Sequence, residues 1–181
     1  MNLTKTVKIS TLMSAWLIAA PHIRSESPSP ALSPIAFLTT HEWEAKLPDS
    51  AGGKKRMIHA QFSWSQNGQA IRISNQFVTD GKPTPYIDGL YAWDPQRRVI
   101  AFWYVSADGS LTEGTVKAEG GKLVHEFHEI QADGKAADFV ARVTPLGNEG
   151  WENEILARRE GQLTPIVKVR YEIADSGAAT R

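Results

Sequence analysis

The sequence contains no cysteine among its 181 residues. Disulfide bonds, a thiol nucleophile, thiolate metal sites and a lipidated N-terminal cysteine are therefore excluded together. The chain also has no excess of either charge, because 20 Lys and Arg balance 20 Asp and Glu. Without a long-range field that attracts polyanions, nucleic-acid binding is not expected. Stability has to come from packing, and a chain of this length is enough for one domain with a substantial core.

Several catalytic and structural patterns are also missing. The sequence has no serine-nucleophile motif, no glycine-rich phosphate loop and no metalloprotease helix, since its glycines stand singly or in pairs. No stretch has the periodicity of a long amphipathic helix, which argues against an α/β fold. These absences disfavour hydrolase and nucleotide chemistry.

The N-terminus has the pattern of an export signal. Lys5 and Lys8 precede an uncharged stretch, 9–20, that is far shorter than the ~20 apolar residues of a membrane-spanning helix. We predict a signal peptide at 1–25, although a cut after the upstream Ala-Ala pair competes with a cut after Ser25. The expected location is periplasmic or secreted, with no integral membrane segment once the signal is removed.

The remaining chain is predicted to form a lead-in, one barrel domain and a disordered tail. Residues 26–33 are rich in proline and serine, which favours an extended, mobile lead-in. A serine-proline pair then resembles a helix N-cap followed by proline at the first helical position, so a short helical turn is expected at 34–38, where it would plug one end of a barrel. The barrel domain spans 34–175 and the disordered tail spans 176–181.

Strand-like runs rich in β-branched and aromatic residues follow one another between turn formers. Separators such as Asn67-Gly68 and Asp108-Gly109 suit tight hairpin turns, in which backbone φ must be positive. Consecutive hairpins make a meander, and closure into a barrel removes the exposed edges that would aggregate. We therefore predict an all-β fold, an antiparallel up-and-down barrel of about ten strands with the short N-terminal helical turn. The runs are 43–47, 55–65, 70–78, 86–93, 99–106, 111–118, 123–130, 136–144, 151–159 and 166–173.

Alternation along the runs predicts a cavity inside the barrel. Ile71, Ile73 and Phe77 share a parity with Asn75 and oppose a polar set on the same run, as in a strand with one inward and one solvated face. The run 99–106 is apolar on both parities, so the sequence does not decide which of its two faces points into the barrel. Apolar residues mixed with scattered polar ones on the inward faces favour a lined cavity over a dry, filled core.

Two segments carry a family resemblance: GLYAWDPQRRVIAFWYVSADGSLTEG at 89–114 and the closing VRYEIA at 169–174. With the upstream IAFLTTHEWEA, they make residues 32–173 resemble the bacterial lipocalin-like, calycin-type β-barrels grouped as a domain of unknown function, and more distantly the haem-binding nitrobindin barrels. The resemblance implies a small-molecule cavity but names no ligand and no catalytic residue. Haem binding of the nitrobindin kind uses a histidine from a late strand, and no histidine follows His128, so we predict no cofactor.

Seven residues in the runs are candidates for contacting a ligand. Inward charges would have to pair, with Arg142 as the natural partner of a carboxylate or an anionic ligand head. An outward, solvated orientation of the charged candidates is an equal alternative. Trp103 and Tyr104 are the rings expected to stack on a flat or apolar ligand. No metal site is predicted, because the cluster around His125 and His128 would need a third ligand, such as His59 across the barrel, and the spacing is not that of a known zinc motif. The candidates are Asn75, Asp88, Trp103, Glu113, His125, Arg142 and Glu154.

These observations predict an exported lipocalin-like protein that binds a small, largely apolar or amphipathic ligand in the barrel lumen. One alternative is an enzyme that uses cavity carboxylates with His125 or His128 on a lipid-like or aromatic substrate, for which a carboxylate close to the histidine would be required. The other is an envelope protein-interaction module, for which a filled lumen and an exposed apolar patch would be required.

Overall fold

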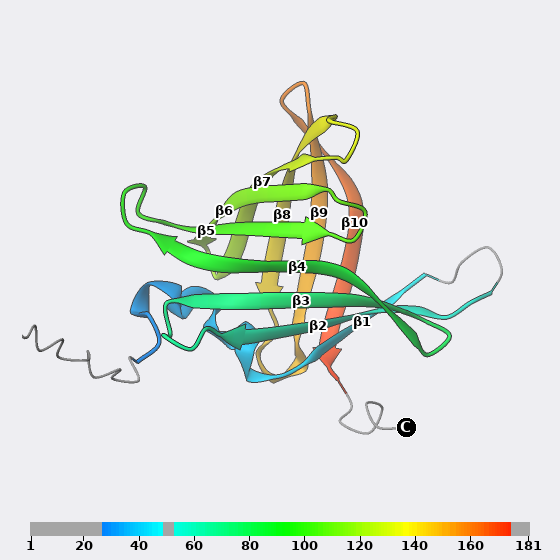
Figure 1. The fold of residues 1–181 in the computed structure, drawn as a ribbon, viewed down its shortest axis with the longest axis horizontal. Coiled ribbons are helices and arrows are strands. Elements are labelled where there is room, and N and C mark those ends of the chain that lie inside the picture. Colours follow the sequence, from blue (N-terminus) through cyan, green and yellow to red (C-terminus); the bar gives the residue numbers. More distant parts are fainter. Residues whose placement is uncertain (1–26, 49–52, 175–181) are drawn as a thin grey trace, which may run out of the picture.

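Ten strands close into one antiparallel barrel in the computed structural model, which describes residues 27–48 and 53–174 (Figure 1). The predicted fold class is confirmed. The predicted signal peptide and the predicted tail lie outside the described residues. The elements are η1 (Pro30–Thr40), β1 (Trp43–Leu47), β2 (Arg56–Trp64), β3 (Ala70–Thr79), β4 (Lys82–Asp94), β5 (Val99–Ser106), β6 (Leu111–Glu119), β7 (Lys122–Ile130), β8 (Ala136–Pro145), η2 (Gly147–Glu149), β9 (Trp151–Arg159) and β10 (Gln162–Ile173).

Each strand pairs with its neighbours in sequence, and β1 closes the ring against β10. The closing register sets Trp43 opposite Ile173 and Ala45 opposite Tyr171. Closure gives every strand two partners, which removes the unpaired edges of an open meander. The expected turn chemistry is present, for example at Gly68, whose φ of 68° in the β2–β3 turn is one that glycine adopts without strain.

Two strands are longer than the sequence pattern predicts. β4 begins at Lys82 and β10 at Gln162, each four residues before its expected start. Both extensions contain proline, which cannot donate a hydrogen bond to the ladder and argues against a strand when the sequence is considered alone. The register shifts beside Pro85 and Pro165 show how the sheet accommodates them, because a bulge at each position relieves the missing donor.

The segment η1 covers one end of the barrel, as expected, but begins at Pro30 rather than at residue 34 (Figure 1). Leu32 and Ile35 have no exposed surface, so burial of Leu32 extends the ordered segment into what the sequence suggested was a mobile lead-in. Ser29 donates its backbone N–H to the carbonyl of Gly68, at 2.9 Å, which ties η1 to the β2–β3 turn. Within the described ranges, no helix has the length and apolar character needed to cross a membrane.

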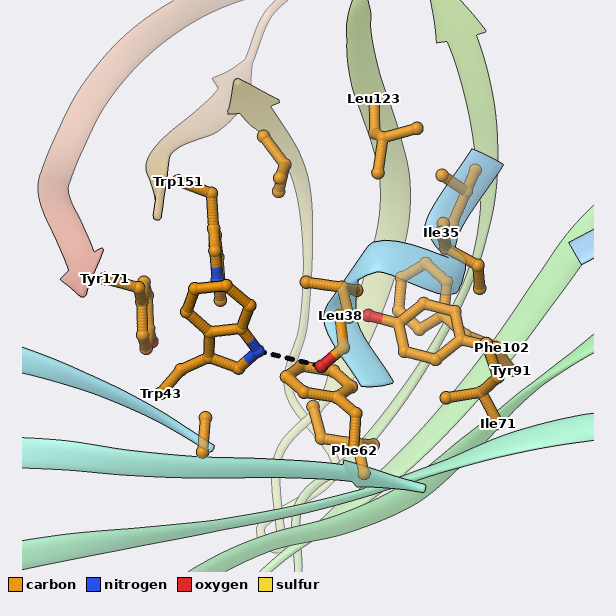
Figure 2. Packing of buried hydrophobic residues seen from close by; sticks show 14 of the residues in the cluster. Ile35, Leu38, Trp43, Phe62, Ile71, Tyr91, Phe102, Leu123, Trp151 and Tyr171 are labelled. Carbon is orange, nitrogen blue, oxygen red and sulfur yellow. Dashed lines mark hydrogen bonds between the residues drawn. The ribbon is translucent and has the colours of Figure 1, made fainter. Parts of the chain in front are cut away.

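An aromatic cluster joins η1 to the barrel wall (Figure 2). The indole Nε1–H of Trp43 donates to the carbonyl of Leu38 at 2.8 Å. Trp151 stacks on Tyr171 with ring centroids 3.8 Å apart, and its edge meets Trp43 at 6.3 Å. These rings pack between η1 and the barrel wall and hold η1 against the end of the barrel.

Candidate functional site

The lumen holds a cavity of about 440 Å³. Residues from η1 and from each of the ten strands line it. Most of its wall is aliphatic or aromatic, including Phe62, Phe102 and Ile155. A volume of this size, with apolar walls and few polar groups, is typical of sites for small organic molecules. Within the described residues the lumen is thus hollow, whereas the interaction-module alternative required a filled one. The outer face does carry exposed apolar residues, such as Val105 and Leu111 opposite each other on β5 and β6.

Four buried polar atoms in the cavity wall have no hydrogen-bond partner. They are Oδ1 of Asn75, Nδ1 of His125, Nε1 of Trp151 and Oδ1 of Asn153. Among the described residues, these are the buried side-chain nitrogen and oxygen atoms that lack a partner, and all four belong to residues that line the same cavity. Buried polar groups are ordinarily paired, and each unpaired one costs roughly 1–3 kcal/mol. The concentration of unpaired groups at one cavity therefore marks a candidate binding site.

A chain of hydrogen bonds leads to His125. The hydroxyl of Tyr104 donates to the hydroxyl of Tyr91, which lies 3.5 Å from Nε2 of His125. Because Tyr91 accepts from Tyr104, its own proton is free to go to Nε2. In the tautomer whose Nε2 accepts this proton, the neutral imidazole carries its own proton on Nδ1, and Nδ1 is then an unpaired donor.

The inner part of this wall stays uncharged at neutral pH. Burial lowers the pKa of His125 to about 4, so the imidazole is neutral. Burial also raises the pKa of Tyr91 to about 12, an effect that the hydrogen bond from Tyr104 partly offsets. The pKa of Tyr104 is raised well above its usual value, first by burial and then by the neighbouring Tyr91. The side chains of His125, Tyr91 and Tyr104 are therefore all uncharged at neutral pH.

The charged residues of the cavity wall lie at the end of the barrel away from η1. Antiparallel hairpins put the β2–β3, β6–β7 and β8–β9 connections at the end that η1 covers, which we call the closed end. His125, Trp151 and Asn153 stand early in strands that start there. Arg56 is the first residue of β2 and Glu129 the second-last of β7, so both lie toward the opposite end, which we call the mouth. Burial and the nearby Glu129 raise the pKa of Tyr86, which also lies on the mouth side.

Two of the seven sequence candidates, Asn75 and His125, line the cavity. The other five point out of the barrel, because each is next in its strand to a cavity-lining residue and successive side chains face opposite sides. For the charged members, the outward alternative is thus the one that the structure has. The five are Asp88, Trp103, Glu113, Arg142 and Glu154.

Trp103 and Glu113 lie together on the outer face. They line a shallow depression of about 330 Å³ across β5–β9. Its floor includes the hydrogen-bonding contact between Nδ1 of His128 and the carboxylate of Asp138, at 2.8 Å. Arg142 does pair with a carboxylate, that of Glu154 at 3.4 Å, but outside the barrel. Asp88 is exposed and stands opposite Val105, which is 55% exposed.

The aromatic pair chosen from the sequence is split by the wall. Tyr104 lines the cavity, whereas Trp103 lies outside, so the two rings cannot stack on one ligand. The physical reason is that both parities of β5 are apolar, and hydrophobicity alone cannot orient such a strand. Gly89 gives the missing signal, because a Cβ at this position would collide with the backbone of Trp103 and the ring of Tyr104. The small residue accommodates an inward Tyr104.

Several polar members of the site are missing from the sequence candidates, among them Tyr91, Trp151 and Asn153. A signal for Asn153 exists, since it shares a parity with Trp151 and Ile155 and is the polar member of that set. Tyr91 stands inside the quoted motif, but its pairing with His125 depends on strands three apart in the sheet order. That contact requires the barrel register, which the sequence does not supply.

The enzymatic alternative requires a carboxylate beside His125 or His128 in the cavity. His128 does contact a carboxylate, that of Asp138, but this pair lies in the outer depression and not in the lumen. Among the described residues, His125 hydrogen-bonds with Tyr91 and forms no hydrogen bond or ion pair with a carboxylate. A pKa of about 4 also makes its imidazole a weak base at neutral pH. No group of three or more His, Asp or Glu in the described ranges is placed to hold a metal ion.

Comparison with known proteins supports the fold and goes no further. No family model matches the chain, and no curated protein matches it in sequence. The chain is similar in structure to Rv2717c from M. tuberculosis, known from a crystal structure, with a TM-score of 0.55 and 14% identity. The match covers 82% of this chain and 100% of that one. At this identity the likeness carries the barrel fold alone.

Proposed function

We propose that the protein binds a small, largely apolar molecule in the lumen of the barrel. The observation that carries the proposal is the set of four unpaired polar atoms, all in residues of one cavity with mainly apolar walls. A ligand that brings its own hydrogen-bonding groups would pair these atoms and recover part of their desolvation cost. Its apolar body would be stabilised by the surrounding side chains.

We further propose that the protein works outside the cytoplasm as a lipocalin-like carrier or receptor. The support is the N-terminal pattern of Lys5, Lys8 and the short apolar stretch 9–20, together with the barrel, which suits the calycin-type resemblance. Expression of the full chain in a secreting bacterium tests the export. We expect protein outside the cytoplasm whose N-terminus is Glu26, whereas an uncut chain that stays in the cytoplasm would contradict it.

Native mass spectrometry on the processed chain tests ligand binding directly. We expect a bound mass that is released when the protein is denatured. To show that this mass occupies the lumen, we would compare Ala141→Phe, which fills the cavity, with Val105→Phe, which adds the same ring outside. Loss of the bound mass in the first variant and retention in the second supports the proposal. No bound mass in the unmodified chain, together with no response to a panel of fatty acids, alcohols and aromatic compounds, overturns it.

A further inference from the structure

We propose that the ligand enters polar end first and that this end is uncharged, an amide or a hydroxyl rather than a carboxylate. The inference rests on the proposed lumen binding and adds the class and the orientation of the ligand. It is drawn from where the polar and the charged groups of the cavity wall lie. The alternative it competes with is the reverse orientation, in which an acid leaves its head at the mouth and inserts its tail.

Three of the four unpaired atoms lie toward the closed end. Trp151 and Asn153 are the first and third residues of β9, and His125 is the fourth of the nine residues of β7, on the closed-end half of that strand. The position of Trp151 is fixed independently by its edge contact with Trp43, which bonds to Leu38 of η1. An apolar tail at this end would cover the three atoms without forming hydrogen bonds to them, so the desolvation cost of these polar groups would not be offset. A polar group there pairs them.

Charge excludes a carboxylate from the same place. The acidic and basic residues that line the cavity, apart from His125, are Arg56 and Glu129, and both stand toward the mouth. At the closed end His125 is neutral and 5% exposed, so it provides no positive charge to compensate an anion. An unpaired charge away from water is far more costly than a neutral polar group that finds hydrogen bonds.

The hydrogen-bonding pattern of the closed end also fits a neutral group. Nε1 of Trp151 is a donor, and Nδ1 of His125 is a donor because its other nitrogen faces the hydroxyl of Tyr91. Oδ1 of Asn153 is an acceptor. An amide offers both kinds of partner, because its carbonyl accepts hydrogen bonds and its N–H donates one. A carboxylate has acceptors only and leaves Asn153 Oδ1 facing another oxygen.

The reverse orientation is a specific rival because Arg56 is available at the mouth. Its guanidinium lies over the ring of Phe77, 5.9 Å from the centroid. Among the contacts of the described residues, Arg56 forms no ion pair with a carboxylate. A fatty acid held by Arg56 with its tail inside would therefore be plausible chemistry, and the experiment has to separate the two orientations.

Calorimetric titration at pH 7 with octanamide, 1-octanol and octanoate distinguishes the two ligand orientations, because the three probes differ only at the polar end. We expect octanamide to bind at least about tenfold tighter than octanoate, with octanol between them, as expected from the cost of an uncompensated charge. In Asn153→Leu the affinity for octanamide should fall by about two- to tenfold, the range of one hydrogen bond. Arg56→Gln tests the reverse orientation, which predicts that octanoate binding is lost in this variant.

Each other outcome overturns the inference in an identifiable way. If octanoate binds as tightly as octanamide and Arg56→Gln abolishes its binding, the reverse orientation holds and lumen binding stands. If the unmodified chain prefers octanamide but Asn153→Leu, shown to be folded by circular dichroism, keeps the preference, the closed end is not where the polar group binds. If none of the three probes binds to the unmodified chain, this inference fails, whereas the proposed function is decided separately by the native mass spectrometry and the wider panel.

Discussion

His125 and His128 stand three residues apart on β7 and lie on opposite faces of the same wall. His125 is buried in the lumen, has Tyr91 as its hydrogen-bonding contact and leaves Nδ1 unpaired. His128 lies outside and pairs with Asp138 at 2.8 Å, with water within reach of both. Outside the barrel, polar groups find partners at little energetic cost and contribute little stability. Inside the barrel, a polar group without a hydrogen-bond partner lowers stability, so the unpaired groups of the lumen mark a candidate binding site.

The contrast between the two faces predicts the largest effect for the aromatic wall. Replacing Phe102 by alanine should lower the free energy of unfolding by about 3–5 kcal/mol, because Phe102 is fully buried and its loss leaves a cavity. The matched change Val105→Ala, on the same strand but on the exposed outer face, should cost no more than about 0.5 kcal/mol. Urea unfolding of the two variants measures both values. Equal losses would mean that β5 is not oriented as described.

The buried histidine predicts a loss of stability in mild acid. The folded pKa of His125, about 4, is below the unfolded value of about 6.5, so the unfolded chain binds the proton more tightly. The protein should keep its full stability above pH 6.5 and lose about 3 kcal/mol as the pH falls through 4. Urea unfolding at pH 7, 5.5 and 4.5 follows this loss.

The control for the acid effect is a pair of variants. Exchanging His125 for phenylalanine should remove most of the pH dependence between 6.5 and 4.5, whereas His128→Asn should leave it in place. The aspartates with lowered pKa values, such as Asp94 and Asp133, titrate below this window and do not interfere. A pH dependence that survives in the phenylalanine variant would show that His125 is not the titrating group.

The unpaired acceptor of Asn153 predicts a gain of stability. Leucine has a similar volume and no polar atom, so Asn153→Leu should raise the free energy of unfolding of the ligand-free protein by about 1 kcal/mol. A comparable change on the outer face, Glu154→Leu, should have no such benefit because it breaks the ion pair with Arg142. Thermal unfolding of both variants gives the sign. A clear loss for Asn153→Leu would show that its side chain is bonded in the folded protein.

The sequence was sufficient for the barrel because its evidence is local. Turn pairs such as Asn67-Gly68 and the apolar alternation around Ile71 each depend on a few neighbouring residues, and the meander follows from their order. The strand starts at Lys82 and Gln162 could not be predicted, because proline in a sequence argues against a strand. The bulges that accommodate Pro85 and Pro165 become apparent only in the sheet register.

The site was harder to predict than the fold for a physical reason. Which residues face inward depends on a parity that hydrophobicity fixes for β3 but not for β5, where Phe102 and Trp103 are both large and apolar. Asn75 and His125 could be placed with the lumen because apolar neighbours at two-residue spacing accompany them. Asp88 and Glu113 have similar neighbours and lie outside, so spacing by itself does not separate structural from lumen-facing charges.

The smallest predicted effect concerns the ion pair of Arg142 and Glu154, two residues that the sequence made candidates for the lumen. Arg142 and Glu154 stand opposite each other on β8 and β9, 3.4 Å apart and only half-buried. A double-mutant cycle with Arg142→Gln and Glu154→Gln should give a coupling of about 0.2–1 kcal/mol, which 1 M salt largely removes because exposed pairs are screened. A coupling of several kcal/mol that resists salt would instead place the pair in a dry environment. The outer wall would then resemble the lumen, and the contrast between the two faces would have to be abandoned.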